Sequence, residues 1–302
     1  MNPNELPPLP CYLDGDYTSL PNARVSVMDR GFIFGDGVYE VVPAYGGRLF
    51  RFDQHMARLA RSLAEVRIPN PHSPEEWKQI ASNLIANFDH SALENGQNPS
   101  KTSADHLVYL QITRGVALRD HVMPAGIRPT VFAMCSAMKP PTDTQRQQGA
   151  RCVTADDFRW KKAHIKSTSL LGAVLARQIS ADAGALETIM FRDGFLSEAA
   201  ASNVWIARNG VVLGPPADHL VLEGVRYGLI ESICRDCGLP FQLRRISREE
   251  VVTADEILLS SATKEVLAVT QLDHRPVGTG RPGPVYEALY AGYQLAKQER
   301  AA

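Results

Sequence analysis

Two closely spaced hairpin signals in the second half of the chain constrain its fold more than any other feature. Apolar runs flank Asp193-Gly194, and two further apolar runs flank Asn209-Gly210. Asp-Gly and Asn-Gly accept the positive φ angles of tight turns, so each pair predicts two antiparallel strands. Elsewhere helical and strand patterns mix without βαβ regularity. The pattern favours an α+β fold, with mixed or antiparallel sheets and flanking helices, over a doubly wound parallel sheet.

Hydrophobic periodicity and capping signals predict the other elements. In the first half we expect a strand at 38–44, helices at 52–66 and 73–88, and strands at 107–114 and 130–137. In the second half we expect strands at 151–155, 256–261 and 266–272, a helix at 225–237, and an amphipathic helix at 170–183 with an apolar face of Leu171, Val174, Leu175 and Ile179.

The length of 302 residues suits two domains of ordinary size. A Lys-Pro-Pro-Thr stretch favours a linker at 139–144, which separates a small α/β domain at 1–138 from a larger domain at 145–302 that carries the candidate lysine below. We expect the Pro-rich residues 1–10 to be mobile and the polar residues 90–105 to form an exposed loop.

The balance of charges argues against a nucleic-acid-binding protein, because 32 basic and 33 acidic side chains leave a formal net charge of −1. The start of the chain lacks the features of a signal peptide, and no stretch is long and apolar enough for a membrane helix. Five scattered cysteines do not indicate a disulfide framework, and Cys234-x-x-Cys237 lacks the second pair of a zinc site. We therefore expect a cytoplasmic protein without a metal site.

Lysine is scarce, with 8 residues against 24 arginines, which narrows the search for a reactive amine. A cofactor aldehyde needs a lysine held away from bulk water. Lys166 is the candidate, because it lies at the start of an apolar helix while the other lysines sit mostly among polar neighbours. Burial there would lower its pKa. A lysine that only snorkels at a helix start is the alternative, and the local pattern alone favours it.

Two further places could carry chemistry. Glu198 opens a run of small residues after a hairpin, where a carboxylate could reach the edge of a planar ring or be an ordinary loop residue. Arg114, Arg119 and His121 follow the end of a strand, where they could bind a carboxylate or form a solvated loop in which Asp120 neutralises Arg119.

One glycine motif does not indicate nucleotide binding. Gly35-Asp36-Gly37 lacks the third glycine of a dinucleotide fingerprint and precedes a strand instead of a helix.

Seven blocks, in order over residues 12–295, resemble the class IV pyridoxal-phosphate aminotransferases, which have fold type IV. Within that class the chain is most similar to the D-amino-acid aminotransferases of the D-alanine type. The blocks are 29–31 with 34–42, 53–59, 119–121, 165–167 with 170–176, 198–205, 222–225 and 260–265.

The resemblance implies pyridoxal 5'-phosphate as the cofactor and assigns residues to it. It implies that Lys166 forms the Schiff base and moves the substrate α-proton, that Glu198 pairs with the ring nitrogen, and that Arg58 reaches the phosphate. The other implied cofactor contacts are Arg159 near the ring hydroxyl, Leu222 on the ring, and Gly224, Val225, Arg226, Ala262 and Thr263 around the phosphate. Arg226 and Ala262 stand where relatives often have hydroxyl side chains, and Arg226 could compensate with its charge.

The resemblance also implies that Tyr39, Arg119 and His121 take the substrate carboxylate. This favours transamination of D-amino acids with a 2-oxo acid such as 2-oxoglutarate or pyruvate, in a homodimer. Branched-chain L-amino-acid aminotransferase, (R)-amine aminotransferase and aminodeoxychorismate lyase activities are alternatives on the same fold. A cofactor-free binding module is a further alternative, which the presence of Lys166, Glu198 and Arg58 disfavours.

Overall fold

The computed structural model describes residues 6–94 and 105–298, and these form two compact units. The first unit runs to Met138 and also contains Ile165–Ser169, and the second contains Lys139–His164 and the chain from Leu170 onward. The segment with Lys166 therefore belongs to the first unit, although the sequence placed it in the domain at 145–302. Residues 1–5 of the expected mobile start and 95–104 of the expected loop lie outside the described residues.

The first unit contains an antiparallel sheet whose described strands follow the order β2-β1-β6-β5-β3-β4. Its strands are β1 (Pro10–Leu13), β2 (Asp16–Ser19), β3 (Gly37–Tyr45), β4 (Arg48–Leu49), β5 (His106–Thr113) and β6 (Thr130–Ala137). Burial alternates along β5 and β6, so one side chain in two enters the core. The strands expected at 38–44, 107–114 and 130–137 are confirmed.

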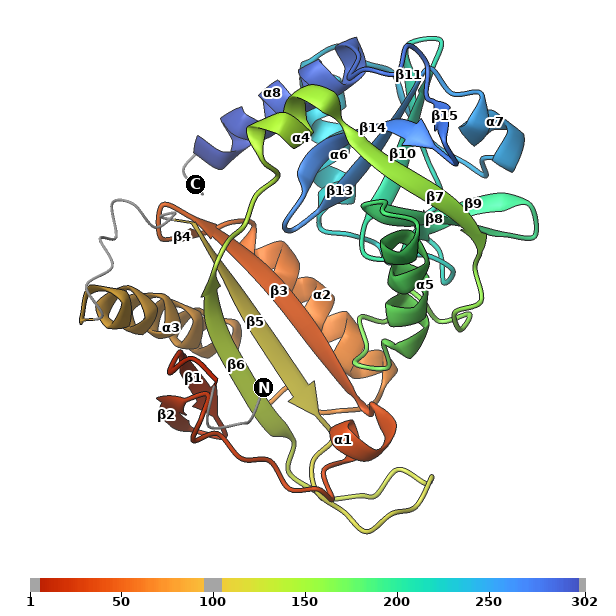
Figure 1. Cartoon of the computed structure of the whole chain (residues 1–302). Helices are drawn as coiled ribbons and strands as arrows, with labels where there is room; N and C mark the ends of the chain where they lie inside the picture. Colours follow the sequence, from red (N-terminus) through yellow and green to blue (C-terminus); the bar gives the residue numbers. More distant parts are fainter. Residues whose placement is uncertain (1–5, 95–104, 299–302) are drawn as a thin grey trace. The chain divides into compact units, whose positions relative to one another are not determined.

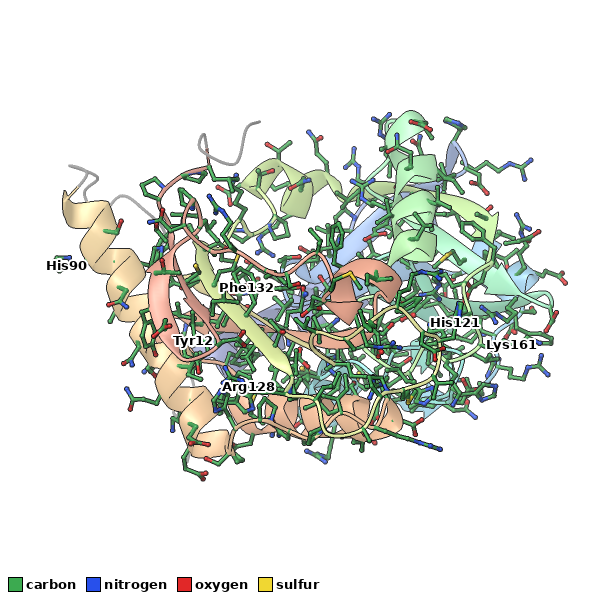
Figure 2. All side chains as sticks on the ribbon, turned by 90° about the horizontal axis from the view of Figure 1, so that it is seen from below. Tyr12, His90, His121, Arg128, Phe132 and Lys161 are labelled. Carbon is green, nitrogen blue, oxygen red and sulfur yellow. The ribbon has the colours of Figure 1, made fainter. Side chains whose placement is uncertain are left out.

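Two long helices cover the core face of this sheet (Figure 1). They are α2 (Phe52–Glu65) and α3 (Pro74–Glu94), and a short helix, α1 (Arg30–Phe34), precedes β3. Leu59 and Leu63 of α2 and Trp77 and Leu84 of α3 are buried against apolar side chains of the strands. The helix α3 runs past the expected end at 88, so 90–94 is helical and not loop. Figure 2 shows His90 on this helix.

The second unit contains a mixed sheet with the described order β12-β11-β10-β13-β14-β7-β8-β9, and β15 pairs with β14. Its strands are β7 (Ala150–Asp156), β8 (Glu187–Arg192), β9 (Phe195–Ala199), β10 (Asn203–Arg208), β11 (Val211–Gly214), β12 (Phe241–Leu243), β13 (Glu256–Ser261), β14 (Glu265–Leu272) and β15 (Arg275–Pro276). The hairpins β8–β9 and β10–β11 turn at Asp193-Gly194 and Asn209-Gly210, and all four turn residues have positive φ. The α+β prediction with mixed and antiparallel sheets is confirmed.

Helices α4 (Asp143–Gln148), α5 (Leu171–Asp182), α6 (Arg226–Asp236), α7 (Arg248–Val252) and α8 (Pro284–Gln298) complete the second unit. α4 starts within the expected linker 139–144, because Thr142 and Gln145 form a capping box there. No helix in the described ranges is long and apolar enough to cross a membrane.

The apolar face predicted for the helix at 170–183 is not buried in the chain. Leu171 is 72% exposed, Val174 58% and Leu175 52%, whereas Ala176 and Ser180 are the buried residues of α5. The small side chains face β7 and β8, and the large ones face outward.

Candidate active site

Lys166 lies in the first unit beside the start of β3. Its backbone N–H donates to Ser62 Oγ of α2 (3.2 Å), and its carbonyl accepts from the Tyr39 N–H (2.9 Å). The Lys166 Nζ lies 4.2 Å from the centre of the Tyr39 ring. The half-buried amine is thus held between α2 and β3, with an aromatic face beside it.

Arg58 lies one turn before Ser62 on α2, so both occupy one side of the helix. Its Nε and Nη2 donate to the two oxygens of the fully buried Glu40 at 2.9 and 2.6 Å, and His55 Nδ1 lies 3.0 Å from Glu40 Oε1. Burial alone would raise the pKa of Glu40, but Arg58 and His55 hold this pKa well below its usual range. The buried carboxylate fixes the direction of the Arg58 guanidinium.

Glu198 lies in the second unit, at the end of β9, where it is 5% exposed. Arg159 Nη1 donates to Glu198 Oε1 (2.7 Å), and the Leu222 N–H donates to Oε2 (3.2 Å). Burial raises the pKa of Glu198 even though Arg159 and Leu222 counteract it. Arg159 Nε and Nη2 in turn donate to the two carboxylate oxygens of Asp157, both at 2.9 Å. Arg159, implied near the ring hydroxyl, therefore contacts the carboxylate implied at the ring nitrogen.

The residues implied around the phosphate lie at two turns of the second unit. Val225 is the N-cap of α6 and Gly224 precedes it; a Cβ on Gly224 would come 2.1 Å from Asn203 Oδ1. The side chain of Arg226 is buried, and its Nη2 donates to Tyr293 Oη of α8 (3.1 Å). This contact directs Nη2 of the guanidinium toward α8. The backbone N–H of Arg226 is therefore a better candidate for binding the phosphate than its side chain.

Ala262 and Thr263 form the turn between β13 and β14. Ser261 Oγ accepts from the Lys264 N–H (3.0 Å) across this turn. Lys264 Nζ donates to the buried Glu187 (2.8 Å), which anchors the far side of the turn.

The residues implied for the substrate carboxylate fall into two places. Tyr39 contacts Lys166 and stacks on Tyr109, with ring centres 5.8 Å apart. Arg119 and His121 instead both contact Phe34. The Arg119 Cζ lies 5.5 Å from the centre of the Phe34 ring, and the His121 and Phe34 ring centres are 5.4 Å apart. Both lie on the exposed loop after β5, and Figure 2 labels His121 there.

The donor set present fits pyridoxal phosphate. The first unit offers a half-buried amine at Lys166 and a buried guanidinium at Arg58. The second offers the buried carboxylate of Glu198 and, at Val225, a helix N-terminus without a side-chain cap. An aldehyde, a phosphate and a ring nitrogen are the groups that such residues hold.

Sequence reasoning missed the charged partners that direct these side chains, namely Glu40 for Arg58 and Asp157 for Arg159. Glu40 was visible within the block at 34–42, but no local pattern pairs a strand residue with a helix residue 18 positions away. The Asp157-x-Arg159 spacing is the one signal that could have found the second pair.

Comparison with known proteins identifies the class. Residues 37–272 match the family model of amino-transferase class IV. The chain is 36% identical over 270 residues to D-alanine aminotransferase from Bacillus licheniformis, covering 89% of this chain and 90% of that protein. It is 33% identical over 284 residues to D-alanine aminotransferase from Staphylococcus aureus (strain MSSA476), covering 94% and 96%.

Solved structures share the fold. The branched-chain amino acid aminotransferase from Escherichia coli has a TM-score of 0.80 at 22% identity, over 93% of this chain and 91% of that chain. The branched-chain aminotransferase from Thermoproteus uzoniensis with norvaline has a TM-score of 0.81 at 24% identity, over 96% of each chain.

This chain belongs to the class IV aminotransferases and has their α+β fold. Within the class it is similar to D-alanine aminotransferases. Enzymes of this class use pyridoxal phosphate, which is accordingly the cofactor of this chain.

Proposed function

We propose that the enzyme transaminates D-amino acids of the D-alanine type with a 2-oxo acid such as 2-oxoglutarate or pyruvate. The observation that carries this proposal is the pair Arg119 and His121 on Phe34. Arg119 is exposed and makes no ion pair with any residue that the structure describes. The side chain of Asp120, which could have neutralised Arg119, accepts from the Val122 N–H instead (3.2 Å). A guanidinium beside an imidazole suits a substrate carboxylate.

When bound, pyridoxal phosphate supplies an aldehyde and an electron-withdrawing ring. Under this proposal, Lys166 Nζ would take the proton from the substrate Cα and would then deliver it to the former aldehyde carbon of the cofactor. Glu198 would pair with the protonated ring nitrogen, and Arg159, which donates to Glu198 Oε1, stabilises the ionised carboxylate. In the first unit Arg58, directed by Glu40, would bind the phosphate, and in the second unit the backbone amides at the start of α6 would offer donors to a phosphate.

The position of the substrate carboxylate decides which enantiomer reacts. A carboxylate fixed by Arg119 and His121 leaves one orientation of the α-hydrogen toward Lys166, and we assign that orientation to the D-enantiomer. The identity to D-alanine aminotransferases supports this assignment.

Substitution of Arg119 tests the proposal. Arg119→Ala should lower kcat/KM for D-alanine about 30- to 150-fold, because a charge-assisted Arg–carboxylate contact contributes on the order of 2–3 kcal/mol. Arg128→Ala is the matched control, because Arg128 is an exposed arginine of the same unit that contacts the Asp14 carbonyl. Activity toward L-leucine or (R)-phenylethylamine that exceeds activity toward D-alanine would favour one of the alternative reactions on this fold.

A homodimer belongs to the same proposal. The loop that carries Arg119 and His121 also exposes Leu118 (87%) and Val122 (72%), and α5 exposes its apolar face. Exposed apolar patches of this kind mark interaction surfaces. The cytoplasmic location expected from the sequence is likewise part of the proposal.

A further inference from the structure

The Gly35-Asp36-Gly37 turn, which lacks the pattern of a dinucleotide fingerprint, has a structural role in the first unit. Gly35 ends α1 with a positive φ of 65°, and a Cβ there would lie 2.8 Å from Ser169 Oγ. A Cβ on Gly37 would lie 2.7 Å from the Ile112 carbonyl oxygen. Because neither glycine has a side chain, the turn can approach both the Lys166 segment and β5 closely. Asp36 is the residue between the two glycines.

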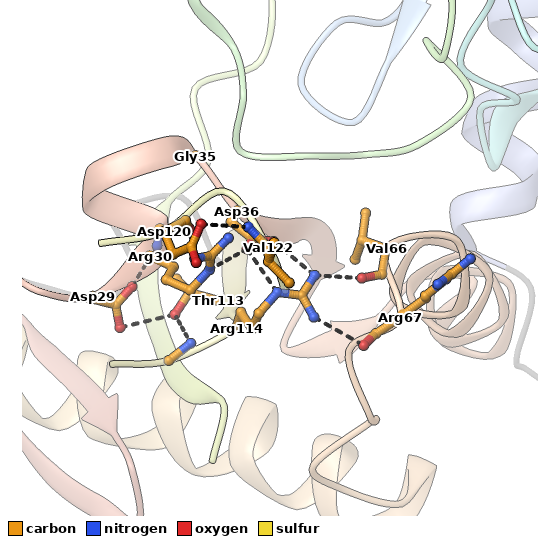
Figure 3. Close-up of polar contacts among 12 residues, drawn as sticks. Asp29, Arg30, Gly35, Asp36, Val66, Arg67, Thr113, Arg114, Asp120 and Val122 are labelled. Carbon is orange, nitrogen blue, oxygen red and sulfur yellow. Dashed lines mark hydrogen bonds and ion pairs between the residues drawn. The ribbon is translucent and has the colours of Figure 1, made fainter. Parts of the chain in front are cut away.

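Asp36 forms ion pairs with two buried arginines, Arg30 and Arg114 (Figure 3). Arg30 Nε and Arg114 Nε both donate to Asp36 Oδ2, at 2.8 and 2.7 Å, and Arg114 Nη2 donates to Oδ1 (3.0 Å). Burial would raise the pKa of Asp36, but the hydrogen bonds and charges of the two arginines keep this pKa below its usual range. Asp36 is therefore an anion that balances two buried cations.

The remaining side-chain hydrogen bonds of the two arginines go to different places. Arg30 Nη1 donates to the Asp120 carbonyl oxygen (2.6 Å), between Arg119 and His121. Arg114 instead donates to the carbonyl oxygens of Val66 (2.6 Å) and Arg67 (3.1 Å), at the end of α2. Only Arg30 connects Asp36 to the loop through these side-chain contacts, which the close-up in Figure 3 displays.

Arg30 also contacts the Phe34 ring, on which the side chains of the loop pack. Its Cζ lies 4.7 Å from the centre of the Phe34 ring, which Arg119 and His121 also contact. The Arg30 N–H donates to the Gly115 carbonyl oxygen (2.9 Å) at the beginning of the same loop. Arg30 therefore fixes the backbone between Arg119 and His121 as well as the ring beside them.

We propose that Arg30, oriented by Asp36, is a positioning residue that sets the affinity of this enzyme for the carboxylate of its substrates. The inference rests on the proposed function, in which Arg119 and His121 bind that carboxylate. The guanidinium of Arg30 can donate to Asp36 and Asp120 at once because its nitrogens form a planar fork, whereas a lysine ammonium has a single nitrogen.

Arg30→Lys tests the proposal, because it keeps the charge beside Asp36 and loses the fork. We expect KM for D-alanine and pyruvate to rise at least fivefold, with kcat and the Kd for pyridoxal phosphate within twofold of the wild type. Arg114→Lys is the matched variant of the same cluster and should keep KM within twofold, because Arg114 does not reach Asp120. Hydrogen exchange of the amides at 116–123 should be faster in Arg30→Lys than in Arg114→Lys.

A double variant separates positioning from a general loss of structure. In an Arg119→Ala background, Arg30→Lys should raise KM by a smaller factor than it does in the wild type, since one of the two residues that it positions is already missing. If Arg30→Lys has the wild-type KM while Arg119→Ala raises KM, the inference about Arg30 is overturned and the proposed carboxylate site is not. If Arg119→Ala leaves KM unchanged, the proposed carboxylate site and the inference both fail.

Discussion

At the residue scale, the candidate site depends on two buried carboxylates in opposite environments. Glu40 accepts from Arg58 and faces His55, so its pKa is lowered, whereas burial raises the pKa of Glu198 despite Arg159. A carboxylate held as an anion can direct a guanidinium toward a phosphate. Burial makes the ionised form of a carboxylate energetically unfavourable, and a protonated ring nitrogen beside it would stabilise that ionised form.

Glu40→Gln should destabilise the apoenzyme by about 3–5 kcal/mol at pH 7, because it leaves the Arg58 charge buried without its anion. The pKa of Glu40 is lower in the folded chain than in the unfolded chain, where it is about 4.3. Its contribution to stability is therefore complete above that unfolded value and is lost as the pH falls toward the folded one. Urea unfolding of the wild type and the variant from pH 7 to pH 3 measures both effects.

The control for this prediction is Glu75→Gln, an exposed substitution in the first turn of α3, which should change stability by no more than about 0.5 kcal/mol. A Glu40→Gln variant with wild-type stability at pH 7 would show that the pair does not hold α2 to β3. A difference that grows as the pH falls would contradict the assigned direction of the pKa shift.

The sequence indicated the reactive groups better than their partners. Lys166 stood out because lysine is scarce, and the resemblance then assigned it a role. The contacts of Glu198 with Arg159 and Leu222 join residues 39 and 24 positions apart. Such pairs depend on tertiary packing, which periodicity and local composition do not encode.

At the element scale, local signals predicted the fold where turn chemistry decides it. Asp193-Gly194 and Asn209-Gly210 adopt the positive φ angles expected of them. The apolar face of α5 was predicted from its period, and the structure shows that this face is exposed; the 3.6-residue period describes any apolar surface, whatever covers it. The extension of α3 to Glu94 had no local signal, since residues 90–94 have no apolar period of their own.

The turn before α6 should tolerate no side chain at Gly224. Gly224→Ala would place a Cβ 2.1 Å from Asn203 Oδ1, and Asn203 Nδ2 also donates to the Leu222 carbonyl oxygen (2.9 Å). We expect at least a tenfold higher Kd for pyridoxal phosphate, because the displaced turn carries the amides of Val225 and Arg226. Titration of the apoenzyme with the cofactor, followed by absorbance, measures it.

Gly210→Ala is the control, because it adds the same methyl group at the β10–β11 turn, where a Cβ meets nothing within 4 Å. Its positive φ of 75° should cost about 1 kcal/mol of stability without a change in the Kd. Equal Kd values for Gly224→Ala and the wild type would remove this turn from the phosphate site.

At the scale of the whole molecule, the exposed face of α5 should be covered by a second copy of the chain. The double variant Leu171→Asp/Val174→Asp places two charges on this face and should shift the enzyme from dimer to monomer, as measured by light scattering after size-exclusion chromatography. Leu295→Asp on α8, where the leucine is 63% exposed, is the matched control and should leave the dimer intact. A wild-type enzyme that is monomeric at micromolar concentration would contradict the proposed dimer.

The most direct test of the proposed function is a single half-reaction of the holoenzyme without any 2-oxo acid. Mixing with D-alanine should convert the absorbance of bound pyridoxal phosphate to that of the pyridoxamine form and release pyruvate, while L-alanine and L-leucine should leave the spectrum unchanged over the same time. Conversion by L-leucine with D-alanine inert would contradict the D-amino-acid assignment.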